Sequence, residues 1–282
     1  MLLYLLPQIA AGDVFRIQLD WIPSLGITLS LAIDGLSLLF ALIICGAGFF
    51  VSLYAADYLP AKAETGKFYA YLHGFLLAML GLVMADNLLA LFVFWELTTL
   101  ISYLLIGFEC ELETARQNAR QALLVTGAGG LALLVGFLLL GNIAGTYDLS
   151  QMSLQSGIIK ADPLYLAVLV MVFTGSFTKS AQFPFHFWLP NAMTAPTPIS
   201  AFLHSATMVK AGIYLLARLH PILGGTLAWM GTLVVIGGIT ALLGSILAMQ
   251  ATDLKRSLAF TTIMALGILT MFLGGQATPA LT

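Results

Sequence analysis

Residues 122–141, ALLVTGAGGLALLVGFLLLG, contain no charged side chain and run for about the length that a helix needs to cross a bilayer. Because an α-helix rises 1.5 Å per residue, about 20 residues cover the roughly 30 Å of hydrocarbon. A helix also satisfies its own backbone hydrogen bonds, as hydrocarbon requires. The stretch therefore predicts a membrane-spanning helix.

The glycines of this stretch also fit a nucleotide-binding fingerprint. Residues Gly127 to Ala132 read G-x-G-x-x-A, and Asp148 follows about twenty residues further on. That fingerprint follows a strand and opens a helix, whereas these glycines lie inside one apolar run. Small residues let two membrane helices approach closely, so we interpret these glycines as helix-packing positions.

The whole chain has the composition of an integral membrane protein. Of its 282 residues, 60% are apolar and only 9% are charged, so its surface is not suited to water. Recurring apolar runs predict an all-α, polytopic transmembrane protein of about eight helices in a single domain, 1–282. The predicted spans are residues 28–55, 68–85, 87–107, 119–141, 163–188, 198–218, 226–249 and 255–275.

The same composition excludes other classes of protein. The net charge is -2 and no run of Lys or Arg offers a basic footprint, so we expect no nucleic-acid partner. H-E-x-x-H and paired C-x-x-C motifs are absent, so the sequence predicts no metal site, and we expect no cofactor. Cys45 lies in an apolar run and Cys110 in a polar connection, so we expect no disulfide between them.

The basic residues predict an orientation. If the helices alternate in direction, one side carries Lys62, Lys67, Arg116, Arg120, Lys255 and Arg256, and the other carries Arg16, Lys160 and Arg218. Six basic residues against three place the first side in the cytoplasm by the positive-inside rule. We therefore expect a multi-pass protein of the cell membrane with the Lys62/Lys67, Arg116/Arg120 and Lys255/Arg256 connections cytoplasmic.

Ionisable residues at membrane depth are the candidate functional residues, because each costs at least about 2.5 kcal/mol at a helix centre unless it meets water or a partner. Five of them lie inside predicted spans: Asp34, Glu96, Lys179, His204 and Lys210. We expect Asp34 to lie two turns into its helix in a structural role. Carboxylates, lysines and histidines can together relay protons, since burial and neighbouring charges tune their protonation.

Residues 174–190, TGSFTKSAQFPFHFWLP, place Lys179 five residues before Pro184. Proline removes a backbone hydrogen bond and frees the carbonyl of residue 180, which in hydrocarbon needs water or a partner. We therefore predict a broken helix near Pro184. His186 returns to roughly the Lys179 face if the helix continues, or else it is only hydrogen-bonded at the interface.

Glu96 is a candidate partner of Lys179, with two interpretations open. The pair could move a proton by approach and separation, or it could be a salt bridge that only packs two helices. His204 and Lys210 are six residues apart and point about 120° apart on a helix, so they need not share one pathway.

Three stretches carry a family resemblance. They are LFVFWELTTLISYLLIG (91–107), TGSFTKSAQFPFHFWLPNAMTAPTPISAFLHSATMVKAGIYLLARL (174–219) and TDLKRSLAF (252–260). They resemble the antiporter-like, proton-translocating subunits shared by respiratory complex I and the Mrp cation/proton antiporters. Lys210 and the HSATM sequence are similar to the large A subunit of the Mrp antiporters. The resemblance covers nearly the whole chain from about residue 20.

The resemblance implies an ion-transporting subunit rather than an enzyme, moving protons in exchange for a monovalent cation, by resemblance sodium. It implies that Glu96 is the family's glutamate, Lys179 its broken-helix lysine and His204 a histidine of the next helix. It also implies partner subunits that are themselves hydrophobic.

The resemblance further divides the chain into three parts. Leading helices cover 28–85, a first five-helix repeat covers 87–218, and a second, inverted repeat starts in 226–282. We interpret the chain as truncated, because family members carry more helices before and after it. Two alternatives remain: a proton-pumping subunit of NADH:quinone oxidoreductase or a related membrane hydrogenase, and an inactive scaffold.

Overall fold

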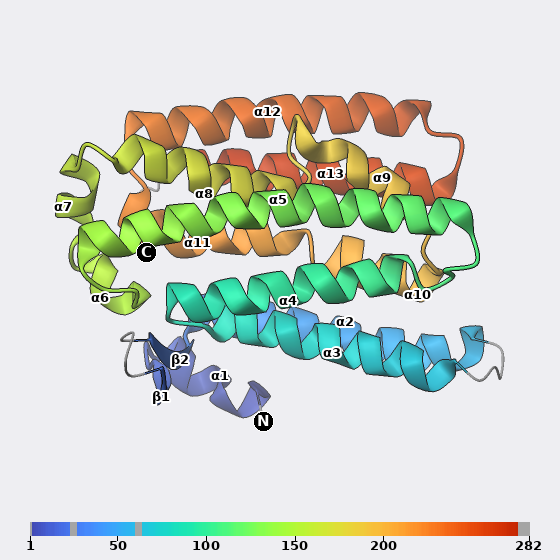
Figure 1. Ribbon diagram of the computed structural model, residues 1–282, viewed down its shortest axis with the longest axis horizontal. Helices are drawn as coiled ribbons and strands as arrows, with labels where there is room; N and C mark the ends of the chain where they lie inside the picture. The colour runs from blue at the N-terminus through green and yellow to red at the C-terminus, as the bar shows by residue number, and fades with distance from the viewer. Residues whose placement is uncertain (1, 23–26, 60–63, 276–282) are drawn as a thin grey trace.

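The computed structural model describes residues 2–22, 27–59 and 64–275 (Figure 1). Long helices lie roughly along one direction, and a small hairpin sits at one end of the bundle (Figure 1). In chain order the elements are α1 (Leu2–Ala10), β1 (Phe15–Ile22), β2 (Ile27–Ile33), α2 (Gly35–Tyr58), α3 (Thr65–Met84), α4 (Leu88–Ile106), α5 (Glu113–Ala144), α6 (Leu149–Ser153), α7 (Ser156–Ala161), α8 (Tyr165–Lys179), η2 (Phe185–Phe187), α9 (Trp188–Ala192), α10 (Thr197–Ser200), η3 (Ala201–Ala206), α11 (Lys210–Leu223), α12 (Leu227–Gln250) and α13 (Leu254–Gly274).

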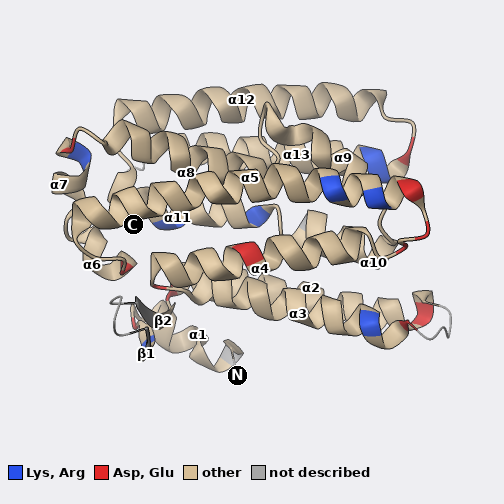
Figure 2. Ribbon diagram, viewed as in Figure 1, with Lys and Arg blue, Asp and Glu red and all other residues tan. Residues whose placement is uncertain are grey.

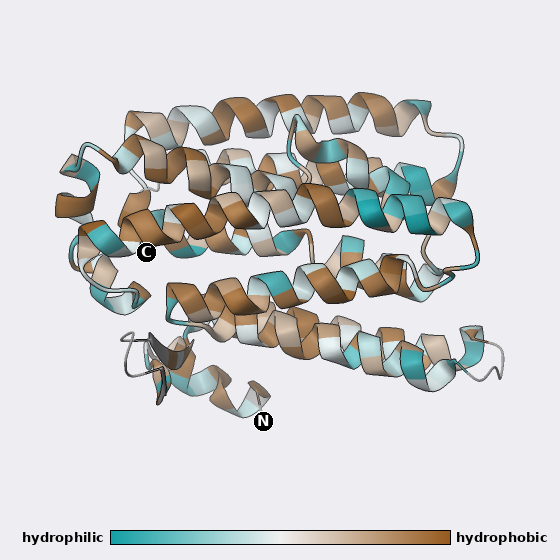
Figure 3. Cartoon of the chain, viewed as in Figure 1, coloured by the Kyte–Doolittle hydropathy of each residue, from teal (hydrophilic) through white to brown (hydrophobic). Residues whose placement is uncertain are grey.

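Six helices of the described chain are long and apolar enough to cross a membrane: α2, α3, α4, α5, α12 and α13. Their outward faces are apolar, and hydrophilic residues gather toward the two ends of the bundle (Figure 3). This confirms the polytopic helical fold. The predicted spans 163–188 and 198–218 are not continuous helices, so the total of eight spans stays a prediction.

The predicted start of the first span, residue 28, is wrong. Residues Ile27–Ile33 form β2, which pairs antiparallel with β1. Both strands alternate apolar and polar side chains, FRIQLDWI and ITLSLAI, and this period of two favours a strand over a helix. The span was predicted from the average apolarity of residues 28–55, and an average does not show alternation.

Asp34 is consequently not inside a helix but caps one. Its carboxylate accepts a hydrogen bond from the Ser37 backbone N–H at 2.9 Å, and its own N–H donates to Ser37 Oγ at 2.7 Å. This reciprocal capping box satisfies backbone donors that the first turn of α2 leaves free. The placement of Asp34 two turns into a span was therefore wrong, while its structural role is consistent with the cap.

Most charged residues lie toward the two ends of the bundle, and a few lie between them, on α4 and α11 (Figure 2). At one end, which we call the loop end, Lys67 lies 5.9 Å from the Phe108 ring and Lys255 Nζ donates to the Ala195 carbonyl at 3.0 Å. At the other, the hairpin end, Arg16 and Arg218 both lie beside Asp86. These contacts agree with the predicted grouping of basic residues, although Lys62 lies outside the described residues.

Two segments that run along the bundle, residues 165–192 and 197–223, are each interrupted near the middle of the bundle. Helix α8 ends at Lys179, the chain turns through residues 180–184, and η2 and α9 continue toward the loop end (Figure 1). In the next crossing, η3 is a π-helix, and residues 207–209 separate it from α11. The predicted break near Pro184 is confirmed, and a second break follows it.

Candidate functional site

At the first break, backbone N–H and C=O groups lose their helical hydrogen-bond partners, and side chains of the protein replace them. Pro184 frees the Ser180 carbonyl, which accepts from Gln182 Nε2 at 3.2 Å. The Thr178 carbonyl accepts from Trp188 Nε1 at 2.9 Å, and Phe183 N–H donates to Thr240 Oγ1 at 2.9 Å. Hydrogen bonds from α9 and α12 thus satisfy the backbone at the break, as an ordered break inside a membrane requires.

Lys179, the last residue of α8, is fully buried and points at α4. Its ammonium donates to Thr98 Oγ1 at 2.7 Å, Thr99 Oγ1 at 2.8 Å and the Trp95 carbonyl at 3.2 Å. The Trp95 ring centroid lies 5.0 Å from Nζ, close enough for a cation–π contact. The three N–H donors of the ammonium therefore bind three neutral oxygens, and no carboxylate of the described residues forms an ion pair with it.

Glu96 is half-buried on α4, one residue from Trp95. The described residues give its Oε1 no hydrogen-bond partner, although that atom is buried. Glu96 and Lys179 interact electrostatically, but the described ion pairs do not include one between them. A salt bridge between Glu96 and Lys179 is therefore not formed among the described residues, and the roles of the two groups stay predictions.

His204 lies in the π-helix η3 and is fully buried. Neither ring nitrogen has a hydrogen-bond partner within the described parts of the chain. The ring meets Trp188 edge to face, with centroids 6.0 Å apart. Trp188 also donates to the Thr178 carbonyl, so this one tryptophan contacts both breaks. The π-helix itself is a further indication, because π-bulges often occur at functional sites.

His186 and Lys210 lie at the edges of this region. His186 is half-buried in η2, with its ring 6.2 Å from that of Phe183. The sequence placed His186 on the same helix face as Lys179 only if the helix continued. Because α8 ends at Lys179, the two residues do not share a helix face. Lys210 opens α11 and is half-buried, and the described residues offer its ammonium no hydrogen bond or ion pair.

Several buried polar atoms near the breaks have no partner in the described protein. Such atoms are expensive to leave unsatisfied and are the usual binding points of internal water. They are Glu96 Oε1, Ser176 Oγ, Ser180 Oγ, Gln182 Oε1 and both ring nitrogens of His204. These atoms are therefore candidate binding points for the water that proton transfer between titratable side chains requires.

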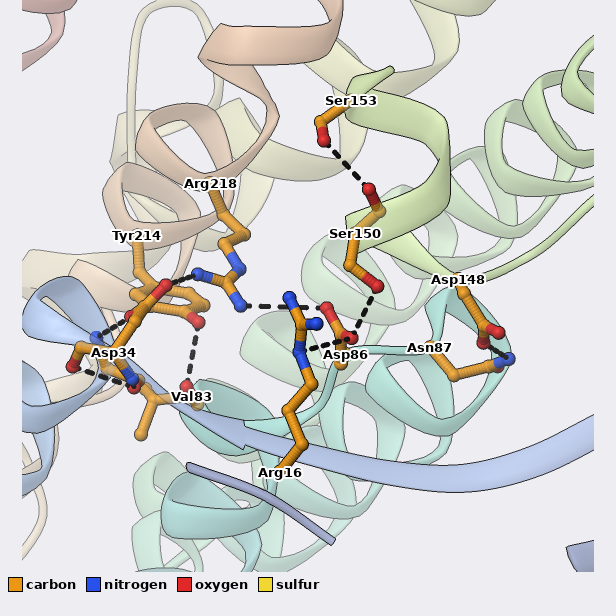
Figure 4. Close-up of polar contacts among 11 residues, drawn as sticks. Arg16, Asp34, Val83, Asp86, Asn87, Asp148, Ser150, Ser153, Tyr214 and Arg218 are labelled. Atoms are coloured by element: carbon orange, nitrogen blue, oxygen red, sulfur yellow. Dashed lines mark hydrogen bonds and ion pairs between the residues drawn. The ribbon is translucent and has the colours of Figure 1, made fainter. Parts of the chain in front are cut away.

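A second group, which we call the charge cluster, consists of Arg16, Asp34, Asp86 and Arg218 at the hairpin end (Figure 4). The Arg218 guanidinium bonds the Asp34 carboxylate and lies 3.8 Å from Asp86, and Arg16 lies 3.9 Å from the same Asp86. The cluster joins β1, the start of α2, the connection after α3 and helix α11.

Backbone and hydroxyl contacts surround the charge cluster. Asp86 N–H donates to the Ser30 carbonyl of β2 at 2.8 Å, and its carboxylate accepts from Ser150 Oγ at 2.9 Å. Tyr214, one turn before Arg218, donates to the Val83 carbonyl at 2.7 Å (Figure 4). The sequence analysis missed this cluster, because it used Arg218 only to count charges and did not single out Asp86. The available signal was Arg218 itself, an arginine at the end of the predicted apolar span 198–218.

Stability at acidic pH should report on Asp34. Burial opposes its ionisation, but Arg218 and the hydrogen bonds from Ser37 outweigh burial and lower the Asp34 pKa. A lowered folded-state pKa stabilises the fold above the unfolded value of about 3.9, and this contribution is lost as pH falls through the folded value. Thermal unfolding in detergent between about pH 7 and pH 3 should therefore depend less on pH in Asp34→Asn than in the wild type. Equal dependence in both would show that Asp34 is not stabilised by its partners.

Family models cover most of the chain. One described as "NADH:quinone oxidoreductase/Mrp antiporter, TM" matches residues 85–281. Another, "NADH-Ubiquinone oxidoreductase (complex I), chain 5 N-terminus", matches residues 21–69. The first covers both broken crossings and every candidate relay residue.

Individual relatives agree with the family models. The A subunit of a Na(+)/H(+) antiporter of Alkalihalophilus pseudofirmus is 48% identical over 94% of this chain and 33% of its own length. A probable K(+)/H(+) antiporter A/B subunit of Rhizobium meliloti is 47% identical over 95% of this chain and 27% of its own length. The chain thus spans about a third of the length of the curated relatives it matches.

A solved structure shows the same architecture. One chain of the Mrp complex from Dietzia sp. DQ12-45-1b superposes with a TM-score of 0.91 and 42% identity, over 99% of this chain and 30% of that one. Similarity at this level extends over the breaks as well as the long helices. The chain therefore belongs to the NADH:quinone oxidoreductase/Mrp antiporter transmembrane family and, within it, is similar to the A subunits of Mrp antiporters.

Proposed function

We propose that this chain is a membrane subunit of a multisubunit monovalent cation/proton antiporter and moves protons through the middle of the membrane. The observation that carries the proposal is Lys179, a fully buried ammonium at the end of a broken helix, whose hydrogen bonds within the described residues all go to neutral oxygens. A buried charge without a touching counter-ion is costly, so both loss and return of its proton are accessible.

The relay residues have distinct roles in this proposal. Lys179 exchanges the proton, and Glu96 acts on it through its charge without pairing. His204 passes the proton onward through water bound at its two unpartnered nitrogens. Lys210 continues the pathway on α11, and His186 lines the hydrated break. Since these residues all lie within 87–218, we propose that this part is one working repeat and that 226–282 begins the next.

The orientation, the cation and the partners complete the proposal. The loop end faces the cytoplasm, because its connections carry the larger number of basic residues. The cation is sodium, supported by the names of the relatives in Alkalihalophilus and Staphylococcus, whereas the Rhizobium relative is named for potassium. The partners are other hydrophobic subunits, and the membrane is the plasma membrane.

The test uses membrane vesicles that contain this chain with the complete set of subunits, from cells without other sodium/proton antiporters. A pH gradient is formed, and sodium, potassium or choline is then added. We expect sodium to dissipate the gradient and choline to leave it unchanged, while a response to potassium alone would correct the cation. If neither cation acts and NADH oxidation instead builds a gradient, the chain serves an oxidoreductase. If nothing acts, it is a scaffold.

A further inference from the structure

Helix α5 packs between the two helices that carry the relay, and two adjacent glycines form the contact. Gly130 faces Glu96 of α4, where an added Cβ would overlap Oε1 and lie 3.0 Å from Cδ. Gly129 faces Thr178 of α8, where an added Cβ would lie 2.7 Å from the Thr178 Cβ. Real Cβ atoms do not approach other atoms this closely, so both positions require glycine or a shift of the neighbour.

Thr178 is not free to shift. Its hydroxyl donates to the carbonyls of Thr174 and Gly175, each at 2.9 Å, and its own carbonyl is held by Trp188. From the other side, an added Cβ at Gly175 would lie 3.0 Å from the Gly129 carbonyl oxygen. The backbones of α5 and α8 therefore lie in direct contact at Gly175, one helical turn before Lys179.

The Glu96 carboxylate, in contrast, can shift. Its Oε1 makes no hydrogen bond to the described protein, so no hydrogen bond holds the side of the group that packs against Gly130. A methyl group at position 130 would push the carboxylate away and change its distance from Lys179. Coulomb energy between two charges falls as this distance grows, so the displacement changes how strongly Glu96 acts on Lys179.

We propose that Gly129 and Gly130 are positioning residues for proton transfer, with Gly130 fixing the Glu96 carboxylate relative to Lys179 and Gly129 fixing the end of α8. This inference rests on the proposed proton-transport function. It goes beyond helix packing, because it proposes that the glycines set the distance between the Glu96 carboxylate and the Lys179 ammonium. The titratable groups facing this level are Glu96 from α4, Lys179 from α8 and His204 from η3, while α5 has none between Gln121 and Ala144.

The chain offers a matched control in the same helix. Gly127 lies three residues before Gly130, and an added Cβ there meets no atom within 4 Å. Gly127→Ala and Gly130→Ala make the same chemical change and give α5 the same gain in helix propensity. Any difference between the two variants therefore reports on the contact with Glu96.

The test compares wild type, Gly127→Ala, Gly130→Ala and the double variant Glu96→Asp/Gly130→Ala in the complete complex. The readouts are the amount of assembled complex and the pH profile of sodium-dependent gradient dissipation. We expect Gly127→Ala to match wild type, and Gly130→Ala to assemble with a profile shifted by about half a pH unit or more. Because aspartate withdraws the carboxylate by one methylene, the double variant should return part of the shift.

Three outcomes would overturn the inference. Gly130→Ala could assemble and keep the wild-type pH profile, or Glu96→Asp could return nothing. Gly130→Ala and the double variant could also both fail to assemble, and this would make Gly130 a packing residue only. In each case a wild type that still responds to sodium leaves the proposed function standing. A wild type that responds to no cation contradicts the proposed function itself.

Discussion

Replacing Lys179 by alanine is expected to reduce sodium-dependent proton movement by at least about 100-fold, the scale for loss of a proton-transfer group. The fold should tolerate the change. The hydrogen bonds of the ammonium within the described residues go to neutral oxygens, and the Thr98 and Thr99 hydroxyls keep their own bonds to the Trp95 carbonyl at 2.7 and 3.1 Å. No charge is therefore left buried without compensation at this contact, and the complex should assemble in normal amount.

Lys179→Arg separates proton exchange from charge. Arginine keeps a positive charge and hydrogen-bond donors in this position, but its guanidinium is not deprotonated in proteins. We expect the arginine variant to assemble and to be as inactive as the alanine variant. Full transport by Lys179→Arg would show that the charge alone matters and that Lys179 carries no proton.

Replacing Arg218 by methionine is expected to destabilise the folded chain by about 3 kcal/mol, the lower end of the range for breaking a buried ion pair. The change leaves two carboxylates without their shared guanidinium. The Asp86 side chain is only 5% exposed, while that of Asp34 is 27% exposed, so part of the penalty is relieved by solvent. Thermal unfolding of the purified protein in detergent measures the effect.

Two controls accompany the Arg218 variant. Arg256→Met removes an arginine from an exposed position at the loop end and should change the unfolding temperature little. The triple variant Arg218→Met/Asp34→Asn/Asp86→Asn removes both stranded charges and should recover much of the loss. An Arg218→Met protein as stable as Arg256→Met would show that the charge cluster does not stabilise the hairpin end.

Apolar run length predicted the long helices well, because a bilayer imposes one length on every span. It failed at residues 27–33, where average apolarity is compatible with both a strand and a helix and only the alternation of side chains distinguishes them. Asp34 was misplaced for the same reason. The partners of Arg218 in the charge cluster could not be predicted, because its two carboxylates are far from it in the sequence and only the packing of α11 against α2 and α3 brings them together.

For the candidate site, the sequence predicted which residues would be buried but not what they would touch. Charge at membrane depth selected Lys179 and Glu96, and proline chemistry predicted the break. Charge complementarity then suggested that the two would pair, whereas the structure gives Lys179 the oxygens of Thr98, Thr99 and Trp95. Uncharged side chains inside an apolar helix give little signal as ligands of an ammonium. The contact of Gly130 with Glu96 was likewise visible only once three helices were in place.

The most direct test of the relay is a double-mutant cycle on Glu96 and Lys179. Sodium-dependent dissipation of a pH gradient is measured for wild type, Glu96→Gln, Lys179→Ala and the double variant, with Gly127→Ala as the control and assembly verified for each. Groups that act as one unit are non-additive, so we expect each single variant to lose transport and the double variant to be no worse than either. Normal transport by assembled Glu96→Gln and Lys179→Ala complexes would contradict the proposal that Lys179 exchanges the proton under the influence of Glu96.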